Sequence, residues 1–485
     1  MSIVIALDLG TTGNRAIAFN EKGEIISSAY YEFKQYYPKP AWVEHNPLEI
    51  LSSTIKALKD VCDEVGLAYI KSIGITNQRE TTVIWDKTTG NPVYNAIVWQ
   101  CRRTTDRCIS LKAEKEQVKQ KTGLFLDPYF SATKIEWILK NVVSGNTNNL
   151  LFGTIDTWLV WNLTKGKVHA TDSSNASRTM LYNIHTNSYD KELLDLFNVP
   201  ESILPQVKET IDNYGVVDGS VLGKEIPIQA VIGDQQSALF CQCGSNTKRL
   251  KNTYGTGLFM MACTGDHLAK TENLVQTIAW RINGKTEYAL EGSAFVGGSL
   301  IQWLRDELKI IKAASETEEI ARSISSNEGV YLVPAFVGLG APYWNPNARG
   351  NLIGLTRGTG RAHIVRAALE SLAYQSQDIL SDIQVNNPEI KFESLLVDGG
   401  AAKNNFLMQF QANISQLNVI RPSITETTAY GVAALAGIAS GVWTEKQFRR
   451  FIKNEQIYEP NMLKSDQENL YKKWKDAVGR SLDWN

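Results

Sequence analysis

The hydrophobic and polar positions near the start of the chain follow a strand–turn–strand pattern. An apolar run at residues 3–7 stops at Asp8, and a second apolar run follows at residues 16–19. Gly10 and Gly13 between them permit a tight turn, and the β-branched residues of the first run favour a strand. The pattern therefore predicts two strands joined by a short polar turn.

Short apolar segments and helical segments alternate further along the chain. Strands are predicted over residues 72–76, 82–86, 227–233, 329–334 and 394–398, and a helix over residues 47–64. This alternation, with a hairpin at the start, predicts an α/β protein with mixed sheets.

Two helices in the second half of the chain show a helical period. One carries apolar residues at the i, i+3, i+4 and i+7 positions Val365, Ala368, Leu369 and Leu372. The other is predicted to begin with a capping box of Ser465 and Glu468, before the apolar positions Leu470, Trp474, Ala477 and Val478. Both stripes are typical of helices that pack on a core.

Three turns rich in glycine and hydroxyl groups mark candidate phosphate sites: residues 8–13, residues 252–257, and residues 397–405 before a helix starting near Asn405. A strand that ends in a carboxylate and continues into Thr and Gly suits a magnesium-bound phosphate. No P-loop lysine follows Asp8, and a second strand replaces the helix of a dinucleotide-binding motif. An ordinary hairpin with a solvated Asp8 is the alternative for the first turn, but three such turns favour a nucleotide bound between two lobes.

Composition narrows the function classes. A chain of 485 residues favours two or three domains, and 50 Lys plus Arg against 51 Asp plus Glu give no electrostatic case for nucleic acid or an anionic membrane. No leader or apolar span is recognisable, so a soluble, cytoplasmic protein with a small-molecule substrate is expected. The six cysteines are too sparse for a disulfide framework and are interpreted as reduced thiols, and the five histidines match no hydrolase motif.

The chain resembles the FGGY carbohydrate kinases, within the actin, hexokinase and Hsp70 ATPase superfamily, and in particular their glycerol-phosphorylating members. The segments that carry the resemblance are residues 74–81, 96–104, 127–134, 152–158, 175–180, 233–236 and 332–343, with two family signatures at residues 129–141 and 350–370. The resemblance implies two actin-like, ribonuclease H-like ATPase lobes with mixed sheets flanked by helices and a cleft between them. We place these lobes at residues 1–242, on the polyol and phosphate side, and residues 243–485, on the adenine side.

The resemblance implies Mg-ATP-dependent phosphorylation of glycerol to sn-glycerol 3-phosphate, as a step of glycerol metabolism, with Asp234 as the general base. The residues expected to bind glycerol are Arg79, Glu80, Trp99, Tyr129, Asp234, Gln235 and Phe259. A small polyol offers only hydroxyl groups, so charged and amide side chains suit its recognition. Phosphoryl transfer asks mainly for positioning and charge neutralisation around one base.

The nucleotide side is implied in the same way. Asp8 is expected to face Mg²⁺ through water. The residues expected to hold ATP are Thr11, Thr12, Gly13, Arg15, Thr256, Gly298, Gln302, Gly400, Ala401 and Asn405. A homo-oligomer, either dimer or tetramer, is also expected.

Each functional role has a structural alternative. Arg79 and Glu80 alone would be interpreted as a surface ion pair, Trp99 and Phe259 as core aromatics, and Asp234 as the N-cap of the next helix. The family motifs around these residues favour the functional roles, and capping by Asp234 is compatible with its role as base.

Alternative functions remain open at this stage. The nearest is a kinase of another polyol or ketose in the same family. A nucleotide-driven clamp without small-molecule chemistry would keep Asp8 and the phosphate turns but would have no reason to keep the polyol residues. Leu9, Gly13 and Asn14 depart from the residues frequent among glycerol-phosphorylating members, which weakens the substrate assignment slightly.

The regulatory loop of the family departs further. Members inhibited by fructose 1,6-bisphosphate carry a longer Gly-rich loop that ends in Arg, whereas residues 221–225 are shorter and end in Glu225. No histidine lies between His185 and His267. We therefore predict neither bisphosphate inhibition in the usual mode nor activation by histidine phosphorylation.

Overall fold

The structure, a computed structural model, describes residues 2–424 and 426–484. These residues fall into two compact units. The first contains the chain up to Cys241 with Gln276–Tyr288 and Glu426–Phe451, and the second contains Gln242–Val275, residues 289–424 and residues 452–484. The chain first passes from the first unit to the second after Cys241, one residue before the predicted division after residue 242. Two later segments, Gln276–Tyr288 and Glu426–Phe451, return to the first unit, and the division into lobes at residues 1–242 and 243–485 stays a prediction.

The first unit is built on a mixed sheet with the strand order β14-β15-β6-β1-β2-β3. Its strands are β1 (Ile3–Leu9), β2 (Gly13–Phe19), β3 (Ile25–Glu32), β6 (Ile70–Asn77), β14 (Val216–Val217) and β15 (Ile226–Gly233). β2 is antiparallel to β1 and β3, whereas β6 is parallel to β1 and β15. The predicted strand–turn–strand at the start of the chain is confirmed, and so are the strands predicted within β6 and β15.

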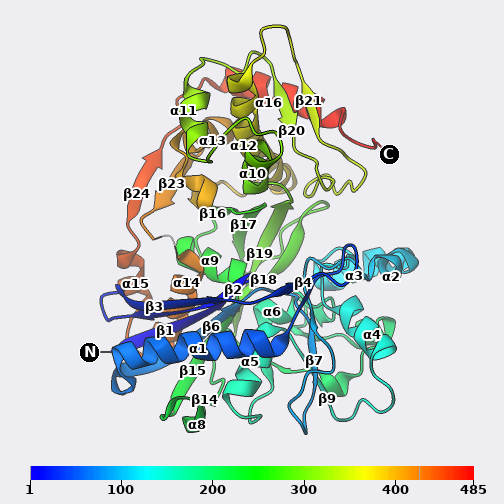
Figure 1. Cartoon of the computed structure of the whole chain (residues 1–485), viewed down its shortest axis with the longest axis vertical. Coiled ribbons are helices and arrows are strands. Elements are labelled where there is room, and N and C mark those ends of the chain that lie inside the picture. The colour runs from blue at the N-terminus through cyan, green and yellow to red at the C-terminus, as the bar shows by residue number, and fades with distance from the viewer. Residues whose placement is uncertain (1, 425, 485) are drawn as a thin grey trace. The chain divides into compact units, whose positions relative to one another are not determined.

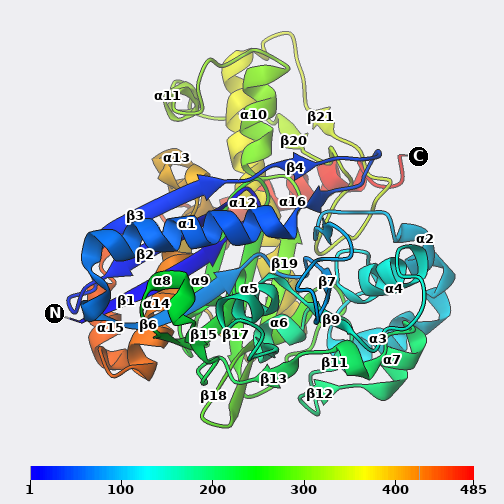
Figure 2. The ribbon, with the colours of Figure 1, turned by 60° about the horizontal axis from the view of Figure 1, so that its bottom comes forward.

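Helix α1 (Pro47–Val65) covers one face of this sheet and lies along β2 and β3, as Figures 1 and 2 show. The Asn46 side chain accepts a hydrogen bond from the Leu48 N–H, and Pro47 suits the first helical position. Gly66 ends the helix with a φ of 83°. The helix predicted over residues 47–64 is confirmed, and its apolar side packs against the inward residues of β1 and β6.

Helix α14 (Thr427–Ala439), which comes late in the chain, packs on β1, β6 and β15. The Ser72 hydroxyl donates to the Ala436 carbonyl over 2.9 Å. A Cβ on Gly74 would lie only 2.6 Å from the Val432 carbonyl oxygen, so this strand needs glycine to admit the helix. This packing places Glu426–Phe451 in the first unit.

The second main sheet repeats the strand plan, with the order β18-β19-β17-β16-β22-β23-β24, in which β18 is Val275–Ile282. The other strands are β16 (Arg249–Tyr254), β17 (Leu258–Gly265), β19 (Lys285–Ala294), β22 (Ser394–Asp398), β23 (Asn418–Pro422) and β24 (Asn454–Tyr458). β16 is antiparallel to β17 and parallel to β22, which is parallel to β23. The predicted turns at residues 8–13 and 252–257 therefore each lie in a hairpin whose first strand has a parallel neighbour.

Three helices build the core of the second unit: α12 (Arg361–Asn386), α13 (Asn405–Ser415) and α16 (Lys464–Gly479). The predicted apolar stripe from Val365 to Leu372 is buried on α12, which confirms it. The capping box predicted at Ser465 is wrong. The helix already begins at Lys464, and the N–H groups of Asp466 and Gln467 donate to the Leu463 carbonyl, so Leu463 is the residue before the helix.

The remaining strands pair mostly in small sheets beside the two main ones, such as β7 with β9 and β20 with β21. They are β4 (Gln35–Tyr36), β5 (Glu44–His45), β7 (Val83–Asp86), β8 (Ala96–Ile97), β9 (Leu150–Gly153), β10 (Ala170–Asp172), β11 (Tyr182–Asn183), β12 (Ser188–Tyr189), β13 (Gln206–Lys208), β20 (Tyr331–Val333) and β21 (Asn351–Ile353). The remaining α-helices are α2 (Thr105–Ser110), α3 (Lys115–Thr122), α4 (Ala132–Asn141), α5 (Ile155–Leu163), α6 (Ser173–Ala176), α7 (Lys191–Leu196), α8 (Gly219–Leu222), α9 (Asp234–Gln242), α10 (Gly298–Asp306), α11 (Glu316–Arg322) and α15 (Glu445–Phe451).

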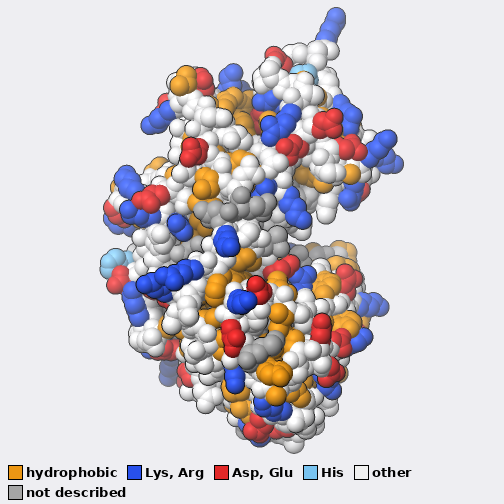
Figure 3. Space-filling view, turned by 90° about the vertical axis from the view of Figure 1, so that its left-hand side faces the viewer, with side chains coloured by type: hydrophobic (Ala, Val, Ile, Leu, Met, Phe, Trp, Pro, Cys, Tyr) orange, Lys and Arg blue, Asp and Glu red, His pale blue; other side chains and the backbone are white. Residues whose placement is uncertain are grey.

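The charges on the surface and the state of the cysteines agree with what the composition predicts. On the face drawn in Figure 3, Lys and Arg side chains lie among Asp and Glu side chains, in keeping with a formal net charge of −1. All six cysteines are buried free thiols, as predicted. Among the described residues, no helix combines the length and the apolar character that a membrane crossing requires.

Candidate active site

The first predicted turn joins β1 to β2 and is fixed from outside by two amide side chains. The Gly10 N–H donates to the Gly13 carbonyl over 3.0 Å. Gln78 donates to the Gly10 carbonyl and Gln35 to the Thr11 carbonyl, each over 2.9 Å. The predicted phosphate turn is thus held in one shape, with the Thr12 side chain exposed.

Two departures from the family pattern in this turn have local structural reasons. A Cβ on Gly13 would lie 2.6 Å from the Tyr30 ring. Asn14 is buried, and its amide donates to the Ile50 carbonyl and the Ser53 hydroxyl on α1. Both residues serve packing around the turn.

Asp8 is the penultimate residue of β1 and lies directly opposite Arg15 in the antiparallel pair. Burial raises the pKa of Asp8 to about 7, the negative charge of Asp234 adds to the rise, and Arg15 opposes it. Arg15 also forms an ion pair with Glu426 at the start of α14. Asp8 and Asp234 are therefore near enough for their charges to interact.

This pair of carboxylates fits a hydrated magnesium ion. Mg²⁺ usually keeps several waters and takes one or two carboxylates rather than a full protein cage. Across residues 2–424 and 426–484 no group of three His, Cys, Asp or Glu side chains stands in a metal-binding arrangement.

The predicted polyol residues of the first unit gather around Arg79. The Arg79 Nε lies 3.3 Å from the Asp234 Oδ1 and 3.7 Å from the Glu80 Oε1. Its Nη1 donates to the Gln236 Oε1 over 3.0 Å, and its Nη2 lies 3.5 Å from the Tyr129 hydroxyl. The Arg79 and Glu80 side chains are only 2% and 1% exposed, whereas that of Asp234 is 28% exposed. The surface ion pair considered from the sequence is therefore excluded.

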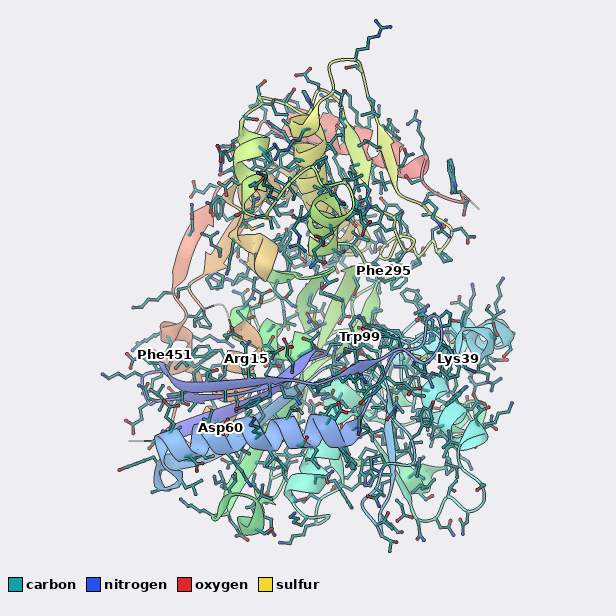
Figure 4. All side chains as sticks on the ribbon, viewed as in Figure 1. Arg15, Lys39, Asp60, Trp99, Phe295 and Phe451 are labelled. Atoms are coloured by element: carbon teal, nitrogen blue, oxygen red, sulfur yellow. The ribbon has the colours of Figure 1, made fainter. Side chains whose placement is uncertain are left out.

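Trp99 connects this cluster to the phosphate turn. Its Nε1 donates to the Thr11 hydroxyl over 3.0 Å, and its ring meets the Tyr129 ring edge to face with centroids 5.6 Å apart. Figure 4 labels Trp99 after β8 and Arg15 on β2. Trp99 is part-buried, so it does not belong to the hydrophobic core.

Asp234 is the first residue of α9, directly after β15. Its Oδ1 accepts the N–H of the part-buried Gln235 over 2.7 Å. A Cβ on the preceding Gly233 would lie 2.8 Å from the Arg79 Cδ, so glycine here lets Arg79 approach. The N-terminal position on a helix favours a negative side chain, so this carboxylate suits both the helix and a catalytic role.

In the second unit, the predicted turn between β16 and β17 packs against the start of α10. The Gly298 N–H donates to the Gly255 carbonyl and the Gly297 N–H to the Thr256 carbonyl, each over 2.7 Å. A Cβ on Gly297 would lie 2.7 Å from the backbone of Gly257. This backbone cluster brings together Thr256 and Gly298, and Gln302 lies exposed on the same helix.

A cavity of about 440 Å³ lies at the end of β22 in the second unit. It is lined by the third predicted turn and the end of β23, including Gly400, Lys403 and Arg421. Ala401 lies in the same turn, and Asn405 begins α13. Phe259 is part-buried on β17, opposite Thr253.

Comparison with known proteins identifies the family. Residues 3–241 match the N-terminal domain of the FGGY family of carbohydrate kinases, and residues 250–440 match the C-terminal domain of that family. The chain belongs to the FGGY family of carbohydrate kinases. The resemblance seen in the sequence is confirmed, and so is the α/β fold class with two domains and mixed sheets.

Three relatives match the FGGY chain almost from end to end. Glycerol kinase 2 of Thermotoga maritima is 53% identical, with 100% of this chain and 99% of the relative covered. The glycerol kinase of Aquifex aeolicus is 51% identical with both chains fully covered. The crystal structure of Plasmodium falciparum glycerol kinase with ADP superposes with a TM-score of 0.94 at 34% identity, covering 99% and 98% of the two chains.

This FGGY kinase contains a charged site residue that the sequence interpretation did not assign. The Arg178 Nε lies 2.6 Å from the Glu80 Oε1, and both side chains are buried. The Arg178 guanidinium also lies over the Tyr129 and Phe130 rings, 5.4 and 5.1 Å from their centroids. An arginine inside the family segment at residues 175–180 was the available signal, but its partner lies 98 residues away.

Lys134 is the second unassigned residue of the FGGY site. Its buried ammonium donates to the Glu80 carbonyl over 3.0 Å and to the Tyr129 carbonyl over 2.7 Å. Burial lowers the pKa of Lys134 to about 7. The Ser131 hydroxyl also donates to the Glu80 carbonyl, and Glu80 has a φ of 61°. These bonds hold a left-handed backbone conformation that a non-glycine residue rarely adopts.

Proposed function

We propose that this chain is a glycerol kinase, which transfers the γ-phosphoryl group of Mg-ATP to glycerol and forms sn-glycerol 3-phosphate. The observation that carries the proposal is the buried Arg79, which lies between Glu80 and the part-exposed Asp234. Relatives with the name glycerol kinase, 51–54% identical over the whole chain, support the choice of substrate. They do not favour a kinase of another polyol or ketose.

The polyol site needs groups that both accept and donate hydrogen bonds to hydroxyls. Glu80 supplies carboxylate oxygens, Arg79 supplies guanidinium donors, and the Tyr129 hydroxyl can do either. Charge-assisted hydrogen bonds are roughly twice as strong as neutral ones, so buried charges suit a ligand that carries no charge itself. Gln235 adds an amide, and Trp99 with Phe259 would contact the carbon backbone.

Asp234 would act as general base. It accepts the proton of the terminal hydroxyl as that oxygen bonds to the γ-phosphorus, while the bond from phosphorus to the bridging oxygen breaks and ADP leaves. The exposure of Asp234, against the burial of Arg79 and Glu80, leaves this carboxylate accessible to a substrate hydroxyl.

The phosphate groups of ATP would bind at Thr11, Thr12, Gly13 and Arg15, and the rest of the nucleotide at Thr256, Gly298, Gln302, Gly400, Ala401 and Asn405. Asp8 would face Mg²⁺ through water, and the bound ion would neutralise phosphate charge. The cytoplasmic location, the homo-oligomeric state, and the absence of bisphosphate inhibition and of histidine phosphorylation stay predictions. Sub-millimolar inhibition by fructose 1,6-bisphosphate would contradict the prediction about the loop at residues 221–225.

The test is ADP release from purified protein with ATP and magnesium, comparing glycerol with a panel of other polyols and ketoses. Asp234→Ala should lower the glycerol-dependent rate by about 10²-fold or more, in the range expected for a lost general base. Asp218→Asn, which alters an aspartate that caps α8 on the surface, serves as the control and should keep the rate. Faster turnover of a ketose than of glycerol would refute the substrate, and turnover without any acceptor would refute the kinase reaction.

A further inference from the structure

The side chain of Asn405 is held by two neighbours in the second unit. Arg421 on β23 donates from Nη1 to the Asn405 Oδ1 over 3.1 Å. Tyr458 on β24 donates from its hydroxyl to the same oxygen over 2.6 Å. The backbone N–H of Asn405 donates to the Glu318 Oε2 over 2.9 Å.

These contacts determine which way round the amide lies. The oxygen and nitrogen of an asparagine amide are usually assigned from their hydrogen-bond partners. A guanidinium has five N–H donors and no acceptor, so the amide atom that faces Arg421 must be the oxygen. A flipped amide would place two N–H donors against the Arg421 donors.

The Asn405 Nδ2 is consequently the group left for a ligand. Within residues 2–424 and 426–484 it has no protein hydrogen-bond partner, and Asn405 is only part-buried. Arg421 also lines the cavity of about 440 Å³ and donates to the Ala402 and Lys403 carbonyls of its wall. The residue that orients the amide is therefore part of the candidate nucleotide pocket.

We propose that Arg421 and Tyr458 are positioning residues that fix the Asn405 amide so that it offers the nucleotide base an N–H donor and no acceptor. This inference rests on the proposed nucleotide site. A donor-only amide matches a ring nitrogen of a purine, which is an acceptor, and does not match the exocyclic amino group of adenine. Asn405 would thus bind the base without reading its amino group.

The proposal is tested by isothermal titration of ADP into the wild-type protein and three variants. Asn405→Asp keeps oxygen atoms for Arg421 and Tyr458 but loses the N–H donor, so the Kd should rise about 10-fold or more. Tyr458→Phe removes one of the two bonds that orient the amide and should raise the Kd about 2- to 5-fold. Tyr331→Phe removes a buried tyrosine hydroxyl that donates to the Leu470 carbonyl instead, and it should leave the Kd unchanged.

ADP analogues in which one ring nitrogen is replaced by C–H identify the acceptor. One of the 1-deaza, 3-deaza and 7-deaza analogues should bind about 3- to 10-fold more weakly than ADP to the wild type, and no more weakly than ADP to Asn405→Asp. Unfolding midpoints close to that of the wild type would show that the variants fold.

The outcomes separate the two proposals. If the wild type binds no ADP, the proposed kinase function fails together with this inference. If ADP binds but Asn405→Asp and Tyr458→Phe bind it as tightly as Tyr331→Phe does, only the positioning role is refuted. The same holds if no deaza analogue distinguishes the wild type from Asn405→Asp.

Discussion

The two units of this FGGY kinase share a strand plan but carry different chemistry at the same place in it. In the first unit β1 forms a hairpin with β2 and is parallel to β6, and in the second β16 forms a hairpin with β17 and is parallel to β22. What differs is the sequence that follows the parallel neighbour. After β6 come Gln78, Arg79 and Glu80, and after β22 come Gly399, Gly400 and Ala401.

The difference shows how the same arrangement of strands can bind two kinds of ligand group. Long polar side chains after β6 hold the first turn and form a buried charged cluster, which suits hydroxyl groups. Small residues after β22 line a cavity together with Lys403 and Arg421, which suits the close approach of a nucleotide. The few residues that follow a strand thus determine which ligand groups can bind there, whereas the strands determine where those residues lie.

The largest expected effect comes from breaking the charged cluster of the first unit. Arg178→Met leaves the buried Glu80 carboxylate without its shortest ion pair, and removing one partner of a buried pair costs about 3–5 kcal/mol. Urea unfolding measures this free energy, and the KM for glycerol should rise as well.

The matched control lies in the second unit. Arg305→Met breaks an ion pair with Asp306 in which both side chains are well exposed, so the free energy of unfolding should change by less than about 0.5 kcal/mol. Equal effects of the two substitutions would contradict the contrast between a buried and an exposed pair.

Two buried groups, one in each unit, should give the free energy of unfolding opposite dependences on pH. Burial lowers the pKa of His45 in the first unit to about 4, so the unfolded chain binds more protons than the folded one between about pH 4 and 6.5. The free energy of unfolding therefore rises with pH across this window. His45→Gln should remove that rise, which amounts to about 3 kcal/mol at most.

Glu370 in the second unit provides the opposite slope. Burial raises the pKa of Glu370 to about 7, so the folded chain binds more protons than the unfolded one between about pH 4.5 and 7. Its contribution is full below about pH 4.5 and is lost as the pH rises to about 7, a loss that Glu370→Gln should remove. Chemical unfolding at a series of pH values checks both variants, and parallel pH profiles for the two would refute the assignment.

A smaller effect is expected when alanine replaces a glycine beside either glycine-containing turn. Gly297→Ala places a methyl group 2.7 Å from the backbone of Gly257, which has no side chain to move, so the variant should lose about 1–3 kcal/mol of stability and bind ADP more weakly. The atoms nearest to a Cβ on Gly13 belong to the side chain of the exposed Tyr30, so Tyr30→Ala in the same chain should rescue Gly13→Ala. Thermal unfolding and titration with ADP measure the stability and the ADP affinity of the variants. If Tyr30→Ala fails to rescue Gly13→Ala, a backbone clash and not the Tyr30 side chain limits the space at the first turn.

The smallest effect concerns the link between the phosphate turn and the polyol cluster. Trp99→Phe loses the hydrogen bond to the Thr11 hydroxyl but keeps an aromatic ring, so kcat/KM for glycerol should fall about 5-fold, equivalent to about 1 kcal/mol. Trp443→Phe loses a comparable bond, to the Glu21 carbonyl, away from the site, and should leave kcat/KM unchanged.

Local patterns predicted much of this fold because they report on nearby contacts. The apolar runs at residues 3–7 and 16–19 and the helical pattern at residues 47–64 concern atoms a few residues apart. The first strand and the helix lie within two residues of their predicted bounds, and the second strand begins at Gly13, three residues before its predicted start. The cap of α16 was missed, because Ser465 and Glu468 satisfy a local rule while the helix begins one residue before Ser465. Competing local signals of similar strength are decided by packing.

The residues of the candidate site also include some that the sequence predicted and some that it did not. The resemblance gave Arg79, Glu80, Tyr129 and Asp234, and the structure brings these residues together. It could not give Arg178 and Lys134, since a buried charge is recognisable only when its partner is known.

The sequence by itself determined the first hairpin, the glycine turns and the family, because these depend on residues that lie close together along the chain. Only the tertiary structure decided that Glu426–Phe451 returns to the first unit, that Arg178 and Lys134 hold Glu80, and that Arg421 and Tyr458 orient Asn405. The physical reason is that these contacts join residues distant in sequence, and the folded chain brings them together through packing of its helices and sheets.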